Sequence, residues 1–530
     1  MNVGREVIYT PYNYIDENNV IEVIRNTFGK YKSVAEECQK LIDFYDGIQP
    51  LMRDNPKQVM TWIDYQCVDN IAAEITEFWK GFAWGFPISY VQRGDSDIEN
   101  SDIAKGIAEL NNNFGMLGND RKLQELAYYL LITGIGYSYI DINTEWERGE
   151  SYFTKDILDP RWTCVVRSNF YPDKRPILAY SVRKDEKDNF YITAFSKDLR
   201  FEISATKIAG SPNKQTDNYY DKYYEWNHLY RSVEENPLHK IPIVEHIRDV
   251  DRTGVFEKLI PSINTLNLML SDIMNGIDQG IQSFFWTNDV ELEKQEVKDT
   301  EGNITLVDKK PGAGDWLHTA TLPNGTQPKI QPLTLDYHLS DMQNNYLAQR
   351  TLILEGAHVP QRNDNSGGST GIAMDSATGW SDAENIASAQ ECVTKTCQME
   401  EIKVVLAAIR ESTSIEGDNP MMILTAGDIQ PAIRRPKNFE ITNKVNSIAT
   451  LLSHGFSLED CVANIPLFQD ATQVIERSGE GVRKYQETIF NTDNEGEGGE
   501  GEQSPNAERT MQDNSDQNTN SPLIGSEVAQ

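Results

Sequence analysis

The sequence has little positive charge, few cysteines and no long apolar run. Acidic residues outnumber basic residues by 81 to 49, which gives the 530-residue chain a net charge of −32. This balance argues against nonspecific adhesion to nucleic acid or to an anionic membrane. The six cysteines form no CxxC pair, a pattern typical of reduced thiols that pack as small hydrophobic groups.

Segments that would direct the chain to or across a membrane are also missing. The most apolar stretch, Leu126 to Ile140, is shorter than a bilayer-spanning helix. The first residues contain no apolar core of a signal peptide. The sequence therefore predicts a soluble protein that is made in a cytoplasm.

Compact motifs of catalysis and cofactor binding are absent as well. Residues 366–371 read SGGSTG, but no lysine follows the glycines as in a phosphate-binding loop. The seven histidines form no HExxH pattern, and no GxSxG turn occurs. We therefore expect no catalytic residue, no metal and no cofactor. An α+β enzyme whose site is dispersed along the chain remains an alternative.

The chain is long enough for two or more domains, because single cores seldom grow beyond about 250–300 residues. Residues 1–29 read as an extended arm. Residues 30–258 show helical periodicity first and alternating β-branched and aromatic runs later, which predicts an α+β region. The expected helices are 31–46, 59–79, 103–114 and 122–133, and the expected strands are 88–92, 137–142, 162–167, 177–183, 189–196, 200–205, 218–229 and 237–247.

The stretch from Leu259 to Phe285 is the strongest helix signal. Its apolar residues recur at steps of three and four, and Pro261 suits a first helical turn. A polar stripe with nearly the same spacing runs alongside and contains no Lys or Arg. An amphipathic helix over an ordinary core explains the periodicity. The uncharged-to-acidic stripe would also suit a helix that packs against neighbours and turns its other face to a wet, anionic channel.

After this helix the sequence predicts a small β-rich module, a returning helix and a loop. The residues DTEGN at 299–303 are a hairpin-turn signal, between expected strands at 289–296 and 304–309. The polar, glycine-rich residues 358–371 predict a loop. The other expected elements are helices over 335–355, 381–416, 441–454, 458–465 and 471–488, strands at 421–425 and 429–433, and a disordered tail from 491.

Five short patterns follow one another along residues 30–490. They are Phe44-Tyr45-Asp46-Gly47; residues 70–74 followed by 81–88; Gly134-Ile135-Gly136-Tyr137; Ile263-Asn264-x-Leu266-Asn267 with Ser271-Asp272 and Asn275; and Ser369-Thr370-Gly371-Ile372-Ala373. Their order and spacing resemble the portal proteins of tailed bacteriophages, in particular the branch typical of long-tailed phages and prophages of Gram-positive bacteria. The glycine-rich loop is longer than the family's usual form, and the two chain ends match nothing.

The resemblance implies a ring, usually of twelve subunits, at one vertex of the capsid. A terminase motor would package double-stranded DNA through this ring, DNA would leave through it, and the ring would connect head and tail. The implied parts are an N-terminal arm (1–29), a wing (30–258), a first stem helix (259–285), a clip (286–333), a second stem helix (334–357), a tunnel loop (358–371), a long wing helix with a return strand (372–440), a helical crown (441–490) and a disordered acidic tail (491–530).

The resemblance also assigns residues to the channel and to the ring contacts. The polar stripe would line the DNA tunnel, and an anionic lining would keep the duplex from binding the wall. The apolar stripe would pack between subunits. The expected lining residues are Asn264, Asn267, Ser271, Asp272, Asn275, Asp278 and Gln282; the expected tunnel-loop residues are Asn363, Asp364, Asn365, Ser366, Gly367 and Gly368; and the expected packing residues are Ile263, Leu266, Leu270, Ile273, Ile277 and Ile281.

The partners implied are further copies of the chain, DNA that passes without sequence-specific binding, the terminase large subunit, major capsid and scaffolding proteins, and head-completion or adaptor proteins. The implied location is the virion, after assembly in the cytoplasm of a host bacterium. Two alternatives stay open at this point: another ring-forming structural protein of a virion, and the α+β enzyme named above.

Overall fold

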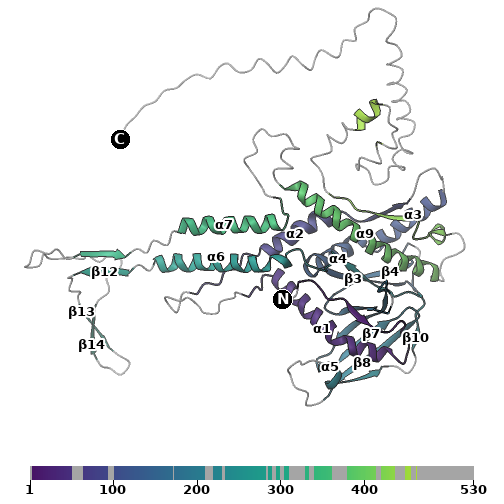
Figure 1. Ribbon diagram of the computed structural model, residues 1–530, viewed down its shortest axis with the longest axis horizontal. Coiled ribbons are helices and arrows are strands. Elements are labelled where there is room, and N and C mark those ends of the chain that lie inside the picture. The colour runs from purple at the N-terminus through teal and green to yellow at the C-terminus, as the bar shows by residue number, and fades with distance from the viewer. Residues whose placement is uncertain are drawn as a thin grey trace, which may run out of the picture. The chain divides into compact units, whose positions relative to one another are not determined.

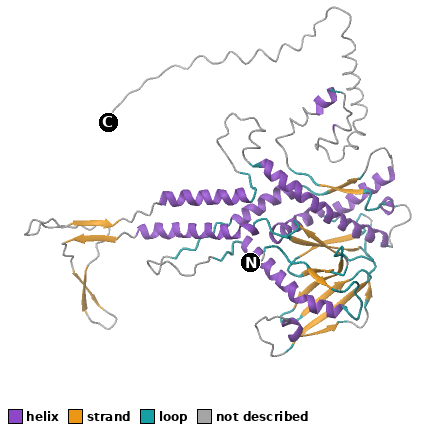
Figure 2. Cartoon of the chain, viewed as in Figure 1, coloured by secondary structure: helices purple, strands orange, loops and turns teal. Residues whose placement is uncertain are grey.

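The computed structural model describes residues 3–50, 64–93, 101–147, 149–170, 172–208, 219–229, 233–281, 284–288, 294–298, 304–308, 329–333, 339–360, 379–412, 419–435, 448–454 and 461 (Figure 1). The chain divides into two units, Met1–Glu440 and Ile441–Gln530. Helices and sheets are mixed in the first unit (Figure 2), which is the α+β class that the sequence predicts. In the second unit, residues 448–453 and residue 461 are helical, and the rest of the helices expected at 458–465 and 471–488 lies outside the described residues.

A seven-stranded sheet forms one part of the first unit. Its strand order is β1-β5-β6-β7-β8-β10, and β9 also pairs with β8. Strands β1 and β5 run parallel, whereas the other pairs are antiparallel. The strands are β1 (Ile8–Thr10), β5 (Thr163–Ser168), β6 (Pro176–Lys184), β7 (Phe190–Phe195), β8 (Leu199–Lys207), β9 (Tyr224–His228) and β10 (Glu234–Glu235).

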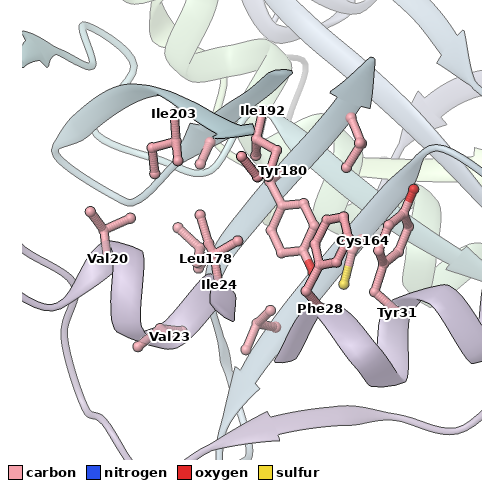
Figure 3. Close-up of a cluster of buried hydrophobic side chains, with 14 of the residues drawn as sticks. Val20, Val23, Ile24, Phe28, Tyr31, Cys164, Leu178, Tyr180, Ile192 and Ile203 are labelled. Atoms are coloured by element: carbon pink, nitrogen blue, oxygen red, sulfur yellow. The ribbon is translucent and has the colours of Figure 1, made fainter. Parts of the chain in front are cut away.

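Helix α1 (Val20–Tyr45) packs its apolar residues against this sheet. Figure 3 shows Val20, Val23, Ile24 and Phe28 on the helix beside sheet residues such as Leu178. The prediction of an extended arm up to residue 29 is therefore wrong. Strand β1 and the helical residues 20–29 belong to the fold. The apolar residues at 20, 23, 24 and 28 lie on one face of α1, and strands that come much later in the sequence bury this face.

A three-stranded sheet has the order β11-β3-β4, and helix α9 (Trp380–Glu411), the longest helix among the described residues, packs against it. Helices α3 (Ser101–Met116) and α4 (Asn119–Thr133) lie nearby in the same unit. The strands are β3 (Ile135–Ile142), β4 (Phe153–Leu158) and β11 (Ile243–Ile247). Strand β4 has no counterpart in the sequence prediction, because its residues FTKDIL carry a weak strand signal.

Smaller elements complete this region. Strand β2 (Ser89–Gln92) pairs with β16 (Ile429–Ala432), and the turn η2 (Pro420–Ile423) contacts α3. The expected strand at 421–425 is therefore a short 3-10 helix. It begins with Pro420, and the side chain of Asn419 accepts a hydrogen bond from the backbone N–H of Met421, which favours a tight turn.

Glu401 fixes α9 to the three-stranded sheet by a buried ionic cluster. Its carboxylate accepts a hydrogen bond from Lys155 Nζ at 2.6 Å and lies 3.0 Å from His246 Nε2. All three side chains are buried. Burial alone would raise the pKa of Glu401, but the charge of Lys155 and the contact with His246 lower this pKa to about 2. Long-range charge pairing therefore positions the helix.

Helix α2 (Ile71–Trp84) packs against α4 and the C-terminal part of α1. The sequence predicts a helix over 59–79, but residues 64–70 have no regular secondary structure and α2 begins at Ile71. Residues 59–63 lie outside the described ranges. The prediction is wrong for residues 64–70 because the side chains of another helix bind their backbone, as described below.

Helices α6 (Ile260–Ile281) and α7 (Leu339–Gly356) run side by side (Figure 1), and the 3-10 turn η1 (Glu257–Leu259) precedes α6. The predicted first helix extends to residue 285, but Phe284 and Phe285 belong to strand β12 (Phe284–Asn288), which pairs with β15 (Lys329–Leu333). The periodicity of the sequence allows Phe284 and Phe285 to belong to a helix or to a strand. They form a strand because they pair with β15, which is distant in the sequence.

Strands β13 (Lys294–Lys298) and β14 (Ile304–Asp308) form an antiparallel hairpin. The residues between them, 299–303, for which the DTEGN signal predicts a turn, lie outside the described ranges. Within the described ranges, no helix is both long enough and apolar enough to cross a membrane.

Candidate functional site

Helix α6 begins in the core of the first unit. Ile263 and Leu266 are buried in a cluster that also contains Ile75 of α2 and Ile353 of α7. Their spacing of three residues places both on one face of the helix. These two side chains therefore stabilise the subunit itself, and the prediction that they pack between subunits is corrected.

The polar stripe of α6 binds an extended segment of the same chain, which we call the strap (residues 64–70). The backbone N–H groups of Tyr65, Cys67 and Asp69 donate hydrogen bonds to side chains of α6. The acceptors are Asn275 Oδ1 at 2.7 Å, Ser271 Oγ at 3.0 Å and Asn267 Oδ1 at 2.8 Å, respectively. Every second residue of the strap thus meets every fourth residue of the helix, in antiparallel order.

The match follows from simple geometry. Two residues of an extended chain span roughly 6.5 Å, and four residues of an α-helix rise by about 6 Å. Each polar side chain satisfies a backbone donor that a non-regular segment would otherwise leave unpaired. Asn275 Nδ2 also donates to the carbonyl of Tyr65 at 3.3 Å, and Asn267 Nδ2 donates to Gln49 Oε1 at 2.6 Å.

Asn267, Ser271 and Asn275 are consequently buried. The prediction that these three side chains line the DNA tunnel is corrected, because the strap covers them within the subunit. Asp272 and Thr265 are exposed on α6. Asp272 follows Asn267 by five residues, which is roughly 140° around a helix. The exposed polar face of α6 thus differs from the face that the stripe suggests.

The strap also binds α7. Tyr346 donates a hydrogen bond to Asp69 Oδ2 at 2.6 Å, and Arg350 Nε donates to the same oxygen at 3.1 Å. Arg350 pairs with Glu74 of α2 as well. Burial and the bond to Asp69 raise the pKa of Tyr346 to about 12. The strap therefore joins both helices of the pair to the start of α2.

The N-terminus holds the base of α6. Arg5 pairs with Glu257 of η1 and, at 3.2 Å, with Glu37 of α1. Glu257 also accepts hydrogen bonds from the N–H groups of Gly4 at 3.0 Å and Gly254 at 2.9 Å. Arg5 and Glu257 are buried. The buried carboxylate of Glu257 is therefore stabilised by the guanidinium of Arg5 and by two backbone N–H groups, and these bonds hold the N-terminal end of α6 in place.

A close backbone approach explains one glycine of the third sequence pattern. Gly134 has a φ of +79° at the C-terminal end of α4, and a Cβ there would lie 2.3 Å from the carbonyl oxygen of Arg252. Only glycine fits both conditions. The loop before α6 can therefore pack directly on the junction of α4 and β3.

The remaining expected residues have varied positions. Leu270, Ile273 and Asp278 are half-buried, as is Asn264, whereas Ile277 is exposed. The side chain of Ile281, residue Gln282 and the tunnel-loop residues 363–368 lie outside the described residues. In the part of the chain that the structure describes, no group of three or more His, Cys, Asp or Glu side chains is placed to hold a metal ion.

A helix pair that continues into paired strands, set on an α+β region, is the arrangement expected of a portal-type subunit. A model of the family described as "Phage portal protein, SPP1 Gp6-like" matches residues 27–487 of the chain. The chain therefore belongs to this family of phage portal proteins, which form the passage for double-stranded DNA at one vertex of the capsid. They are structural components of the virion.

Two solved structures show a similarity over most of the chain. One is the neck of an empty GTA particle, computed with C6 symmetry, with a TM-score of 0.38 and 10% sequence identity over 76% of this chain and 91% of that chain. The other is the virion of a native gene transfer agent particle, with a TM-score of 0.38 and 9% identity over 82% and 94%. No curated protein matches the sequence.

Proposed function

We propose that twelve copies of the chain close into a ring and that α6 and α7 form its stem. Four apolar side chains on these helices support the proposal: Met274 and Ile277 are 40% and 38% exposed, and Leu347 and Leu352 are 50% and 60% exposed. Exposed apolar groups on two adjacent helices are typical of an interface. A contact between unlike surfaces of successive copies closes into a ring when its rotation closes.

In this proposal the chain keeps the division of parts expected from the sequence. Two bounds change: strand β1 and helix α1 join the wing, and the first stem helix is α6, Ile260–Ile281. The clip over 286–333, the tunnel loop over 358–371 and the crown over 441–490 keep the bounds given above. The clip docks the terminase large subunit, and the outer parts contact capsid, scaffolding and head-completion proteins. The chain itself hydrolyses nothing, and the ring assembles in the cytoplasm of the host.

The channel lining is proposed for the residues that the strap does not cover. Asp272 is exposed on α6, and Asp278 and Asn264 are half-buried. The carboxylates of Asp272 and Asp278 repel the phosphates of passing DNA, whereas cationic side chains would bind the phosphates and release their counterions. The loop residues 363–368 and Gln282 complete the proposed lining.

The stem contact is tested by changing exposed apolar residues to aspartate. We expect Ile277→Asp and Leu352→Asp each to shift the purified protein from rings to single subunits in light scattering, since a buried charge opposes close packing. Ile423→Asp is the matched control, because Ile423 is 52% exposed on η2, outside the helix pair. Rings in both stem variants, or loss of rings in the control alone, would refute the proposed contact.

A further inference from the structure

A hollow of about 370 Å³ opens between α1, the ends of β6, β7 and β8, and helix α5 (Tyr219–Tyr223). None of its lining residues belongs to α6 or α7, so it has no part in the proposed stem. Four of its six charged lining residues are cations, although acidic residues prevail in the chain as a whole. The charged lining residues are Lys32, Glu36, Arg161, Lys184, Asp188 and Lys207.

Lys32 carries the least compensated charge in this hollow. Its Nζ lies 4.6 Å from the ring centroid of Phe190, 5.0 Å from that of Trp162 and 5.2 Å from that of Tyr31. Among the described residues, no carboxylate lies within ion-pair distance of this Nζ. Burial and the charge of Lys184 lower the pKa of Lys32 to about 8, although the charge of Glu36 acts in the opposite direction. A bound anion would supply the missing countercharge.

Two further lysines are held at the same hollow. Lys184 Nζ lies 2.6 Å from Asp188, and Lys207 Nζ lies 3.1 Å from the same carboxylate. Asp188 has a φ of +63° in the turn between β6 and β7, where Asp185 accepts hydrogen bonds from Lys187 and Asn189. One carboxylate thus orients two ammonium groups and leaves a positive charge in excess.

Aromatic rings form the rest of the wall. Trp162 is 37% exposed, and the ring centroids of Tyr220 and Tyr224 lie 5.5 Å apart beside Phe190. Flat rings next to lysines suit a planar group attached to an anion, because a base stacks favourably on such a ring. The volume falls within the range of about 300–1,000 Å³ for small-ligand sites.

We propose that this hollow binds a small phosphate-bearing ligand with a flat ring, of the size of a nucleoside monophosphate. The phosphate accepts hydrogen bonds from Lys32 and its neighbouring lysines, and the ring stacks on the aromatic wall. A long nucleic acid is disfavoured, because the net charge of −32 repels an extended polyanion.

The test is a calorimetric titration of the full chain with 2′-deoxyadenosine 5′-monophosphate. Inorganic phosphate and deoxyadenosine serve as separate probes of the two halves. We expect the nucleotide to bind more tightly than either half. Lys32→Met should weaken binding about tenfold or more, because a hydrogen bond to a charged group contributes about 1.5–3 kcal/mol. Lys30→Met is the matched control, since Lys30 lies on the same helix and pairs with Glu6 at 2.8 Å.

A second measurement, chemical labelling of Lys32, uses the unaltered protein and so does not depend on whether a variant folds. In the unaltered protein the Lys32 amine is labelled with cyanate, and the nucleotide should protect it from labelling, as read by peptide mass spectrometry. Absence of saturable binding at millimolar nucleotide, equal binding of nucleotide and inorganic phosphate, equal weakening by both variants, or labelling unaffected by nucleotide would each overturn the proposal.

Discussion

The hydrogen bonds of Asn267 predict that replacing this residue weakens the attachment of the strap to α6. In Asn267→Leu the shape of the side chain is nearly kept, but the N–H of Asp69 loses its acceptor at 2.8 Å and Gln49 loses its donor at 2.6 Å. Each unpaired buried polar group costs about 1–3 kcal/mol. We therefore expect the strap to detach more easily, by about 2 kcal/mol or more.

Hydrogen exchange of the peptide spanning residues 64–70 measures this detachment. A loss of about 2 kcal/mol corresponds to roughly thirtyfold faster exchange at the strap amides. Asn264→Leu is the matched control, because Asn264 is half-buried on the same helix, one turn before Asn267, and within the described residues its Oδ1 accepts no hydrogen bond. The same substitution there removes no acceptor from the strap. Unchanged exchange at 64–70 in Asn267→Leu, or equal acceleration in Asn264→Leu, would refute the reasoning.

Two further predictions concern the contacts that hold the helices. The pKa of Glu401 is about 4.5 in the unfolded chain and about 2 in the folded protein, so its ionised carboxylate stabilises the fold at any pH above about 4.5. This contribution to the free energy of unfolding is about 3 kcal/mol at most, and it is lost as the pH falls from 4.5 toward 2. In urea titrations Glu401→Gln should therefore be less stable than the natural protein at pH 7, and the difference should shrink between pH 4.5 and 2; a constant difference would contradict the ionic role. At the strap, Tyr346→Phe should lower stability more than Arg350→Met, because the Tyr346 hydrogen bond to Asp69 is short at 2.6 Å, whereas the Arg350 pairs are partly exposed and contribute less than about 1 kcal/mol. Thermal unfolding of the two variants measures this order, and the reverse order would contradict it.

Elements with a clear period could be predicted from the sequence. Helices α3 and α4 and strands β5 to β8 and β14 fall close to their expected positions, because local periodicity specifies them. The end of α6 and the start of α2 depend on partners distant in sequence. Pairing of β12 with β15 determines that Phe284 and Phe285 form a strand and do not continue α6. Hydrogen bonds from the backbone of residues 64–70 to side chains of α6 favour an extended segment there over a helix.

The candidate site shows the same division. The polar stripe of α6 is visible in the sequence, but its partner is not. Asn267, Ser271 and Asn275 lack charge, a property that suits backbone amides as well as a channel wall. Their uniform spacing of four residues is the one signal that could have indicated a bound extended segment. Lys32 and its aromatic neighbours come from several separate elements, so their convergence has no local signature.

Electron microscopy of the purified protein tests the central claim most directly. A phage portal protein whose α6 and α7 build a stem should form rings of about a dozen copies around an axial hole, in keeping with a closed interface between unlike surfaces. Compact dimers or tetramers without a hole would contradict the account.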